Sequence, residues 1–166
     1  VLQYANKGLA QNMVSQGGGW YDMWHNVNDA TGYRVINTGL IPITNNFSFN
    51  HVLTYGSADD ITDYTDKSRM VSLVGRAQYQ FTDYVRLIGE VGGFYQKDTY
   101  NNGTHYKQSG EKYTIALGLA DGRDFMSRPE LRVFASYLND SENGKSFDDH
   151  TANNTWNFGV QVEAWW

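Results

Sequence analysis

The stretch "TWNFGVQVEAWW", residues Thr155 to Trp166, separates into two interleaved sets of side chains. The apolar set comprises Trp156, Phe158, Val160, Val162, Ala164 and Trp166. The other set, which has no large apolar residue until its last member, comprises Asn157, Gly159, Gln161, Glu163 and Trp165. Such alternation predicts a β-strand with one dry and one wet face. The apolar set would pack inward in a soluble protein, but it would face lipid in an outer-membrane barrel.

Composition restricts the class of protein. The chain has 166 residues, enough for one domain with a hydrophobic core. It contains no Cys, which excludes a disulfide framework and a thiolate metal site. The mean hydropathy is −0.57, and no apolar run approaches the roughly 18 residues of a membrane helix. The net charge of −5 argues against a nucleic-acid partner. The opening "VLQYANKGLA" lacks both an initiator Met and a signal segment, so we expect a part of a longer sequence.

Period-two alternation along the chain predicts eight strands and no helix. The expected strands are Leu2–Leu9, Tyr33–Leu40, Phe47–Tyr55, Arg69–Phe81, Tyr84–Tyr95, Lys112–Leu119, Glu130–Leu138 and Thr155–Trp166. The links between them alternate in length. The two-residue link Thr82–Asp83 predicts a tight hairpin turn. Long links such as "SADDITDYTDK" and "QKDTYNNGTHYKQSG" are rich in Asp, Asn, Gly and Tyr.

Short turns at one end of the strands and long polar loops at the other are typical of an outer-membrane barrel. Aromatic residues near one rim fit the girdle of such a barrel. These are Tyr79, Phe81, Tyr84, Trp165 and Trp166. We therefore predict that residues 1–166 form a single antiparallel segment of a transmembrane β-barrel, with long extracellular loops and short periplasmic turns. Its location would be the outer membrane of a Gram-negative bacterium, and outer-membrane lipid would be a partner.

Several stretches resemble the sugar-specific porins, the maltoporin and sucrose-porin group. The likeness is densest in "MSRPELRVFASYLND" and "WNFGVQVEAWW", and it extends to "YRVINTGLIPITNNFSFNHVLTYGS" and "VGRAQYQFTDYVRLIGEVGGFY". The resemblance implies an eighteen-stranded barrel that assembles as a homotrimer and passes oligosaccharides. Eight strands would be the C-terminal part of that barrel. We expect no cofactor.

In the resembled family, sugars move along an aromatic track, since the apolar face of a sugar ring packs on aromatic rings. The resemblance places Trp165 on this track. The track position before "SRP" holds Met126 here instead of an aromatic residue, and Phe125 beside it is a candidate substitute. The alternative interpretations are a girdle tryptophan for Trp165 and simple turn packing for Met126.

Charged and polar residues share the face opposite the apolar set. We predict as channel-wall groups Arg76, Arg86, Glu90, Arg132, Gln161 and Glu163. They would either contact the solute or neutralise one another across adjacent strands, which favour pairs of opposite charge. The four His residues show no ligand spacing, so no metal site is expected.

The last strand also resembles the β-signal that the barrel-assembly machinery recognises. The residues concerned are Asn157, Gly159, Val162, Ala164 and Trp166. Recognition would work by edge pairing, because an unpaired strand offers free N–H and C=O groups.

Four functions remain open from the sequence. The leading one is a carbohydrate-selective outer-membrane porin. The others are a client of the assembly machinery without transport of its own, a structural eight-stranded barrel, and a soluble carbohydrate-binding domain. No enzyme is expected, since no strand end gathers a nucleophile with a base.

Overall fold

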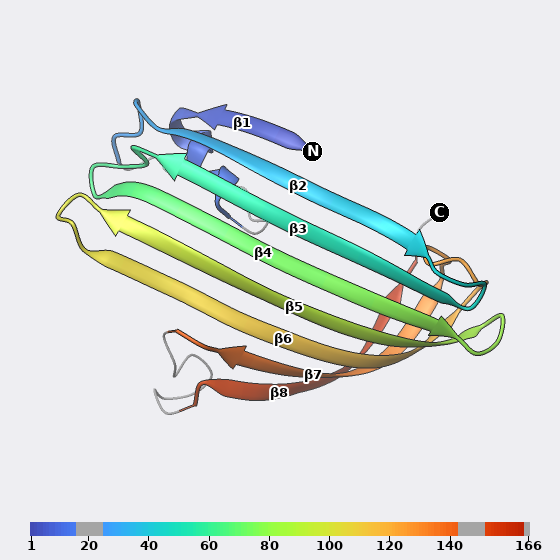
Figure 1. Ribbon diagram of the computed structural model, residues 1–166. Helices are drawn as coiled ribbons and strands as arrows, with labels where there is room; N and C mark the ends of the chain where they lie inside the picture. The colour runs from blue at the N-terminus through green and yellow to red at the C-terminus, as the bar shows by residue number, and fades with distance from the viewer. Residues whose placement is uncertain (16–24, 143–151, 165–166) are drawn as a thin grey trace. The chain divides into compact units, whose positions relative to one another are not determined.

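The computed structural model describes residues 1–15, 25–142 and 152–164, which form eight β-strands and one short 3₁₀-helix. The elements are β1 (Leu2–Asn6), η1 (Lys7–Met13), β2 (Thr31–Pro42), β3 (Phe47–Asp59), β4 (Thr65–Gln80), β5 (Val85–Tyr100), β6 (His105–Ala120), β7 (Glu130–Asp140) and β8 (Asn154–Glu163). The strands form one antiparallel sheet in the order of the chain, from β1 to β8 (Figure 1). This confirms the predicted all-β class and the number of strands.

The pairing of β8 with β7 agrees with the alternation of apolar and polar residues in the last strand. β8 pairs with β7 so that Val160 faces Val133 and Gln161 faces Arg132. Apolar residues therefore meet on one face, and polar residues meet on the other. Val133, Val160 and their apolar neighbours remain exposed on their face of the sheet.

Six strands, β2 to β7, are longer than predicted. β3 and β4 take up most of "SADDITDYTDK", and β5 and β6 take up most of "QKDTYNNGTHYKQSG", so the connections 60–64 and 101–104 are short. Cross-strand polar contacts accompany the extended pairing: the Arg69 guanidinium lies 2.7 Å from an Asp59 oxygen, and the Ser68 hydroxyl donates to Asp98 at 2.6 Å. Because polar side chains occupy both faces in these segments, the hydrophobic period that marks a strand is absent.

The hairpin turn predicted at Thr82–Asp83 spans residues 81–84, and Phe81 N donates to Val85 O at 2.9 Å. The Thr82 hydroxyl accepts the backbone N–H groups of Tyr84 and Val85 at 3.2 and 3.0 Å. In the turns 43–46 and 60–64, the hydroxyls of Thr44 and Thr62 likewise accept hydrogen bonds from backbone N–H groups two and three residues further on. A threonine that stabilises its own turn is a known local motif.

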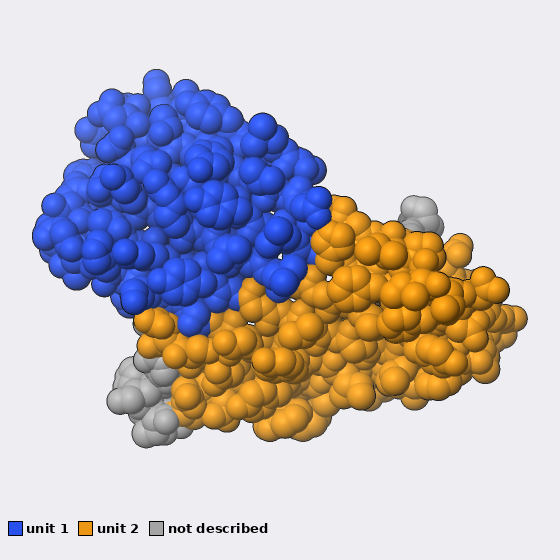
Figure 2. Space-filling view, viewed as in Figure 1, with its two compact units in different colours: residues 1–37, 52–73, 94–109 blue, residues 38–51, 74–93, 110–166 orange. Residues whose placement is uncertain are grey.

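The chain divides into two compact units, coloured separately in Figure 2. Unit 1 comprises Val1–Asn37, Val52–Leu73 and Phe94–Ser109. Unit 2 comprises Thr38–His51, Val74–Gly93 and Gly110–Trp166.

Unit 1 contains the helical turn η1, so the expectation of no helical element is wrong. The chain leaves β1 at Lys7, which has a positive φ of 54°, and the predicted strand over Leu2–Leu9 ends early for that reason. η1 lies directly against the backbones of two glycines: a Cβ at Gly32 would come within 2.6 Å of the Ala10 carbonyl oxygen, and one at Gly56 within 2.1 Å of the Met13 carbonyl oxygen. Only glycine permits this close approach.

A small apolar core follows η1 in unit 1. Its buried members are Val14, Ala58, Ile61 and Met70. The Arg34 guanidinium fixes the end of the turn, because it donates to the carbonyl oxygens of Asn12 and Ser15, both at 3.2 Å. No helix within the described part of the chain has the length and apolar character needed to cross a bilayer.

Candidate functional site on the polar face of unit 2

Unit 2 carries a band of charged side chains on one face of β4 to β8. Arg76 on β4 donates from Nε and Nη2 to one oxygen of Glu90 on β5, at 2.9 and 2.7 Å. Lys112 Nζ on β6 lies 3.7 Å from the other Glu90 oxygen. The sheet thus aligns cation, anion and cation on three successive strands, as cross-strand pairing favours.

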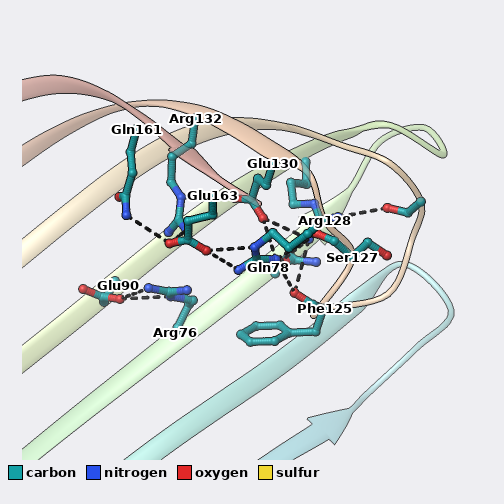
Figure 3. A network of polar contacts seen from close by, with 12 residues as sticks. Arg76, Gln78, Glu90, Phe125, Ser127, Arg128, Glu130, Arg132, Gln161 and Glu163 are labelled. Carbon is teal, nitrogen blue, oxygen red and sulfur yellow. Dashed lines mark hydrogen bonds and ion pairs between the residues drawn. The ribbon is translucent and has the colours of Figure 1, made fainter. Parts of the chain in front are cut away.

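A second group of charges is buried next to this ladder, and Figure 3 shows its contacts. Its members are Arg86, Arg128, Glu130, Arg132 and Glu163. We call this group the arginine cluster. Arg86 is 0% exposed and Glu130 is 2% exposed.

Glu130 lies among three arginines. Its carboxylate is 3.5 Å from Arg86, 3.2 Å from Arg128 and 3.2 Å from Arg132. Removing one partner of a buried charge pair is costly, because the remaining charge cannot return to water. The geometry of the cluster is therefore tightly constrained.

Glu163 joins the end of β8 to the same group. Arg128 Nε donates to Glu163 Oε2 at 2.8 Å, and Arg132 Nη2 donates to Glu163 Oε1. Gln161 also donates to Oε1 at 3.0 Å. The two carboxylates are thus shared among three guanidinium groups, which leaves one excess positive charge in the cluster.

The cluster also holds the connection between β6 and β7, residues 121–129. Arg86 Nη2 donates to the Gly122 carbonyl at 2.9 Å, and Arg86 Nη1 contacts the Phe125 carbonyl at 3.4 Å. Arg128 Nη1 donates to the Ser127 carbonyl at 2.8 Å. The fixed fork of a guanidinium suits several acceptors at once. Charges on the sheet thereby position the backbone that carries Phe125.

The two predicted track residues within the described part of the chain lie in this connection. Met126 is 58% exposed. Phe125 lines a pocket together with Gln78, Gln80 and Arg123. Figure 3 shows the Phe125 ring extending away from the charged groups that contact its carbonyl. The third predicted track residue, Trp165, lies outside the described residues.

All six predicted channel-wall groups lie in unit 2, but they separate into two groups. Arg76 and Glu90 belong to the ladder. The arginine cluster contains Arg86, Arg132 and Glu163, and Gln161 donates to it. Sequence reasoning did not select Glu130 and Arg128, which complete the cluster. Glu130 lies two residues before Arg132 on the same strand, so the period of two would have placed both side chains on the polar face.

Phe134 is a further residue that sequence reasoning missed. It pairs with Gly159 in the register of β7 and β8, between Arg132 and Ser136 on the polar face. A Cβ on Gly159 would lie only 2.7 Å from the Phe134 Cζ, so the ring occupies the space above the glycine. Phe134 also lines a hollow of about 90 Å³ with Lys112 and other polar-face residues. The period of two places Phe134 on the polar face with Arg132 and Ser136, but an apolar side chain is expected on the opposite face.

The opposite face of unit 2 is apolar and exposed. Its exposed members include Leu87, Ile115, Leu117, Leu131, Val133, Trp156, Phe158, Val160 and Val162. A row of ring contacts crosses this face: Tyr137 and Trp156 have centroids 5.3 Å apart, and Trp156 stacks on Phe158 at 5.9 Å. Exposed apolar surface of this extent marks an interaction with protein or membrane.

The predicted β-signal residues divide between the two faces of β8. Asn157 and Gly159 share the polar face, whereas Val162 lies on the apolar face. Ala164 is exposed just after the strand, and Trp166 lies outside the described residues. β8 is the last strand of the described sheet, and it pairs with β7.

An antiparallel sheet with one exposed apolar face and one charged face is consistent with the wall of a porin-type β-barrel. The family model described as LamB porin matches residues 1–166. The chain belongs to this family.

Curated relatives carry the name maltoporin. Maltoporin 1 of Klebsiella pneumoniae is 89% identical over 166 residues, which is 100% of this chain and 39% of the relative. Maltoporin 2 of Yersinia pestis is 82% identical over 100% of this chain and 40% of the relative. Maltoporin 1 of Aeromonas salmonicida is 52% identical over 100% of this chain and 39% of the relative. The chain thus spans 39–40% of the length of these relatives.

Proposed function

We propose that this chain supplies eight strands to the wall of a carbohydrate-selective diffusion channel in the outer membrane of a Gram-negative bacterium. The observation that carries the proposal is the division of faces in unit 2. Arg132, Gln161 and Glu163 share one face, whereas exposed Leu131, Val133 and Val160 lie on the other. Such a wall places apolar side chains in lipid and hydrogen-bonding groups toward a water-filled lumen.

The solute follows from the chemistry of the polar face and from the names of the relatives. Sugar hydroxyls both donate and accept hydrogen bonds, so they match a face rich in guanidinium, carboxylate and amide groups. The apolar face of a sugar ring matches Phe125, Phe134 and, in the proposed track, Trp165. Relatives named maltoporin support an oligosaccharide as the solute. This function is transport and not catalysis, and the proposal includes a homotrimeric parent barrel.

The chain by itself is not expected to form a sugar-blocked pore. β1 and β8 are the outermost strands of the described sheet. In lipid, their free backbone N–H and C=O groups have no water to pair with. We expect further strands of a longer porin to pair with these edges, which would make residues 1–166 a single barrel segment.

Single-channel conductance in a planar bilayer tests the proposal, with the 166-residue chain and the longer porin that carries it measured side by side. The longer porin should show stable current steps that maltose blocks in a concentration-dependent way. The 166-residue chain should show no such steps. A porin indifferent to maltose and sucrose would refute sugar selectivity, and sugar-blocked steps from the chain alone would refute its role as a wall segment.

The position of β8 favours a second candidate function, recognition by the barrel-assembly machinery. An edge strand can add to the edge of another sheet through backbone hydrogen bonds. Deleting Trp165 and Trp166 separates the two functions. Loss of a β-signal would abolish assembly in cells, whereas loss of a track residue would weaken sugar block in a porin that still assembles.

A further inference from the structure

A pocket of about 320 Å³ lies in unit 2 at the end of the sheet where the turn 43–46 and the connection 121–129 are found. No member of the arginine cluster lines it, and it shares no lining residue with the hollow beside Phe134. Its lining includes Thr44, Asn46, Gln78, Gln80, Arg123 and Phe125. We call it the Gln80 pocket.

Gln80 is the last residue of β4 and is only 3% exposed. Among the residues that the structure describes, neither its side-chain nitrogen nor its side-chain oxygen has a hydrogen-bond partner. Gln78, two residues earlier on β4, is also buried, but its side-chain oxygen accepts a hydrogen bond from Arg86 at 3.3 Å. Leaving a buried amide unpaired costs free energy, so such a group calls for a partner that the chain does not supply.

Two charged residues of opposite sign, Arg123 and Asp124, line the pocket. Arg123 Nη1 lies 2.7 Å from an Asp83 oxygen, and Arg123 Nη2 donates to the Asn46 side chain at 2.6 Å. A guanidinium engaged in this way offers little attraction to an anion. The remaining polar lining consists mainly of amides and hydroxyls, which both donate and accept hydrogen bonds. The ligand chemistry that fits is therefore neutral and rich in hydroxyl groups.

Apolar walls accompany these polar groups. Leu40, Pro42 and Phe125 line the same pocket. An aromatic or aliphatic wall beside a few polar groups is typical of small-molecule sites. Phe125 is held there through its backbone, because its carbonyl accepts from the arginine cluster.

We propose that the Gln80 pocket binds one ring of a neutral sugar, with the Gln80 carboxamide donating to one hydroxyl and accepting from its neighbour. The Phe125 ring packs against the sugar's apolar C–H groups. This proposal rests on the proposed function and adds a contact point at the end of the wall that carries the turns 43–46 and 81–84. A buried water that satisfies Gln80 is the competing explanation.

The variant Gln80→Met separates the two explanations, because methionine has a similar length and no hydrogen-bonding amide. In the longer porin that carries this segment, the maltose concentration that halves the conductance should rise roughly five- to hundredfold, as expected for the loss of two neutral hydrogen bonds. Stable current steps without sugar check that the variant still assembles. If Gln80 binds only water, sugar block will equal that of the parent protein.

Two controls keep the result specific. Gln108→Met makes the same replacement on β6 in unit 1, at a residue that does not line the pocket, and should leave maltose block unchanged. Block by a polyethylene glycol of similar mass should be equal in the parent and in Gln80→Met, because this polymer lacks neighbouring hydroxyls. Equal weakening of block by maltose and by the polymer would overturn the proposal.

Failure of the pocket and failure of the channel function are distinguishable. A parent porin without sugar block would refute the proposed function, whereas a parent porin with block that Gln80→Met does not weaken would refute only the pocket. Should Gln80→Met not assemble, Phe125→Leu tests the same site through its ring. This variant should also weaken maltose block, and unchanged block there would count against the proposal.

Discussion

At the scale of single residues, the contact between Gly159 and the Phe134 ring allows a test of packing on the polar face. A Cβ on Gly159 would lie 2.7 Å from Cζ of Phe134, so Gly159→Ala forces the ring to move. Overpacking of this kind costs about 1–3 kcal/mol of the free energy of unfolding. Because the clash involves only the tip of the Phe134 side chain, which can rotate away, we expect a loss near ~1 kcal/mol. Urea unfolding of the porin in lipid vesicles measures it.

The matched control is Gly89→Ala, because nothing lies within 4 Å of a Cβ at Gly89. This change should leave the free energy of unfolding nearly unaltered. Adding Phe134→Leu to Gly159→Ala should restore part of the lost stability. Strictly additive effects in this double-mutant cycle would show that the ring and the glycine do not interact.

At the scale of structural elements, Arg86 joins β5 to the connection between β6 and β7. Arg86→Met removes the donor to the Gly122 carbonyl and one cation beside Glu130. Glu130 keeps Arg128 and Arg132, so the expected loss is that of the charged hydrogen bond to the Gly122 carbonyl, about 1.5–3 kcal/mol. Urea unfolding should show this loss, and limited proteolysis should show earlier cleavage within 121–129.

Arg123→Met is the control for that element, because it removes an exposed ion pair to Asp83. Exposed pairs contribute at most about 1 kcal/mol, so a small change is expected. Equal losses in the two variants would contradict the role of the buried cluster in holding the connection.

At the scale of the whole molecule, two adjacent residues of β4 test which face meets lipid. Leu73 is 54% exposed on the apolar face, and Ser72 points to the other face. Leu73→Lys should destabilise the porin in vesicles by up to about 2–4 kcal/mol, the cost of a lysine on the lipid face near the bilayer midplane. Ser72→Lys should change stability little.

The measurement is the urea midpoint of both variants in the same vesicles. A larger loss for Ser72→Lys than for Leu73→Lys would reverse the assignment of the faces and remove the main support for the channel wall. Small and similar losses of stability in both variants would place Leu73 outside the hydrocarbon layer. The comparison would then be repeated with lysine at Leu117 and at a residue next to it.

The sequence by itself determined the all-β class, the number of strands and the face to which most residues belong. A period of two is a local property of the chain, and it requires no knowledge of distant contacts. It also placed Arg76, Glu90, Arg132 and Glu163 on one face. It failed where both faces are polar, as in "SADDITDYTDK", since no hydrophobic period marks the strand there.

The tertiary structure alone decided which of these residues meet. Register brings Gln161 beside Arg132, and the 121–129 connection adds Arg128 to the same cluster. The docking of η1 on Gly32 and Gly56 and the unpaired amide of Gln80 are likewise invisible in the chain, because each depends on backbone segments distant in sequence. Alternation fixes the direction of a side chain, whereas only strand pairing and connection geometry fix its neighbours.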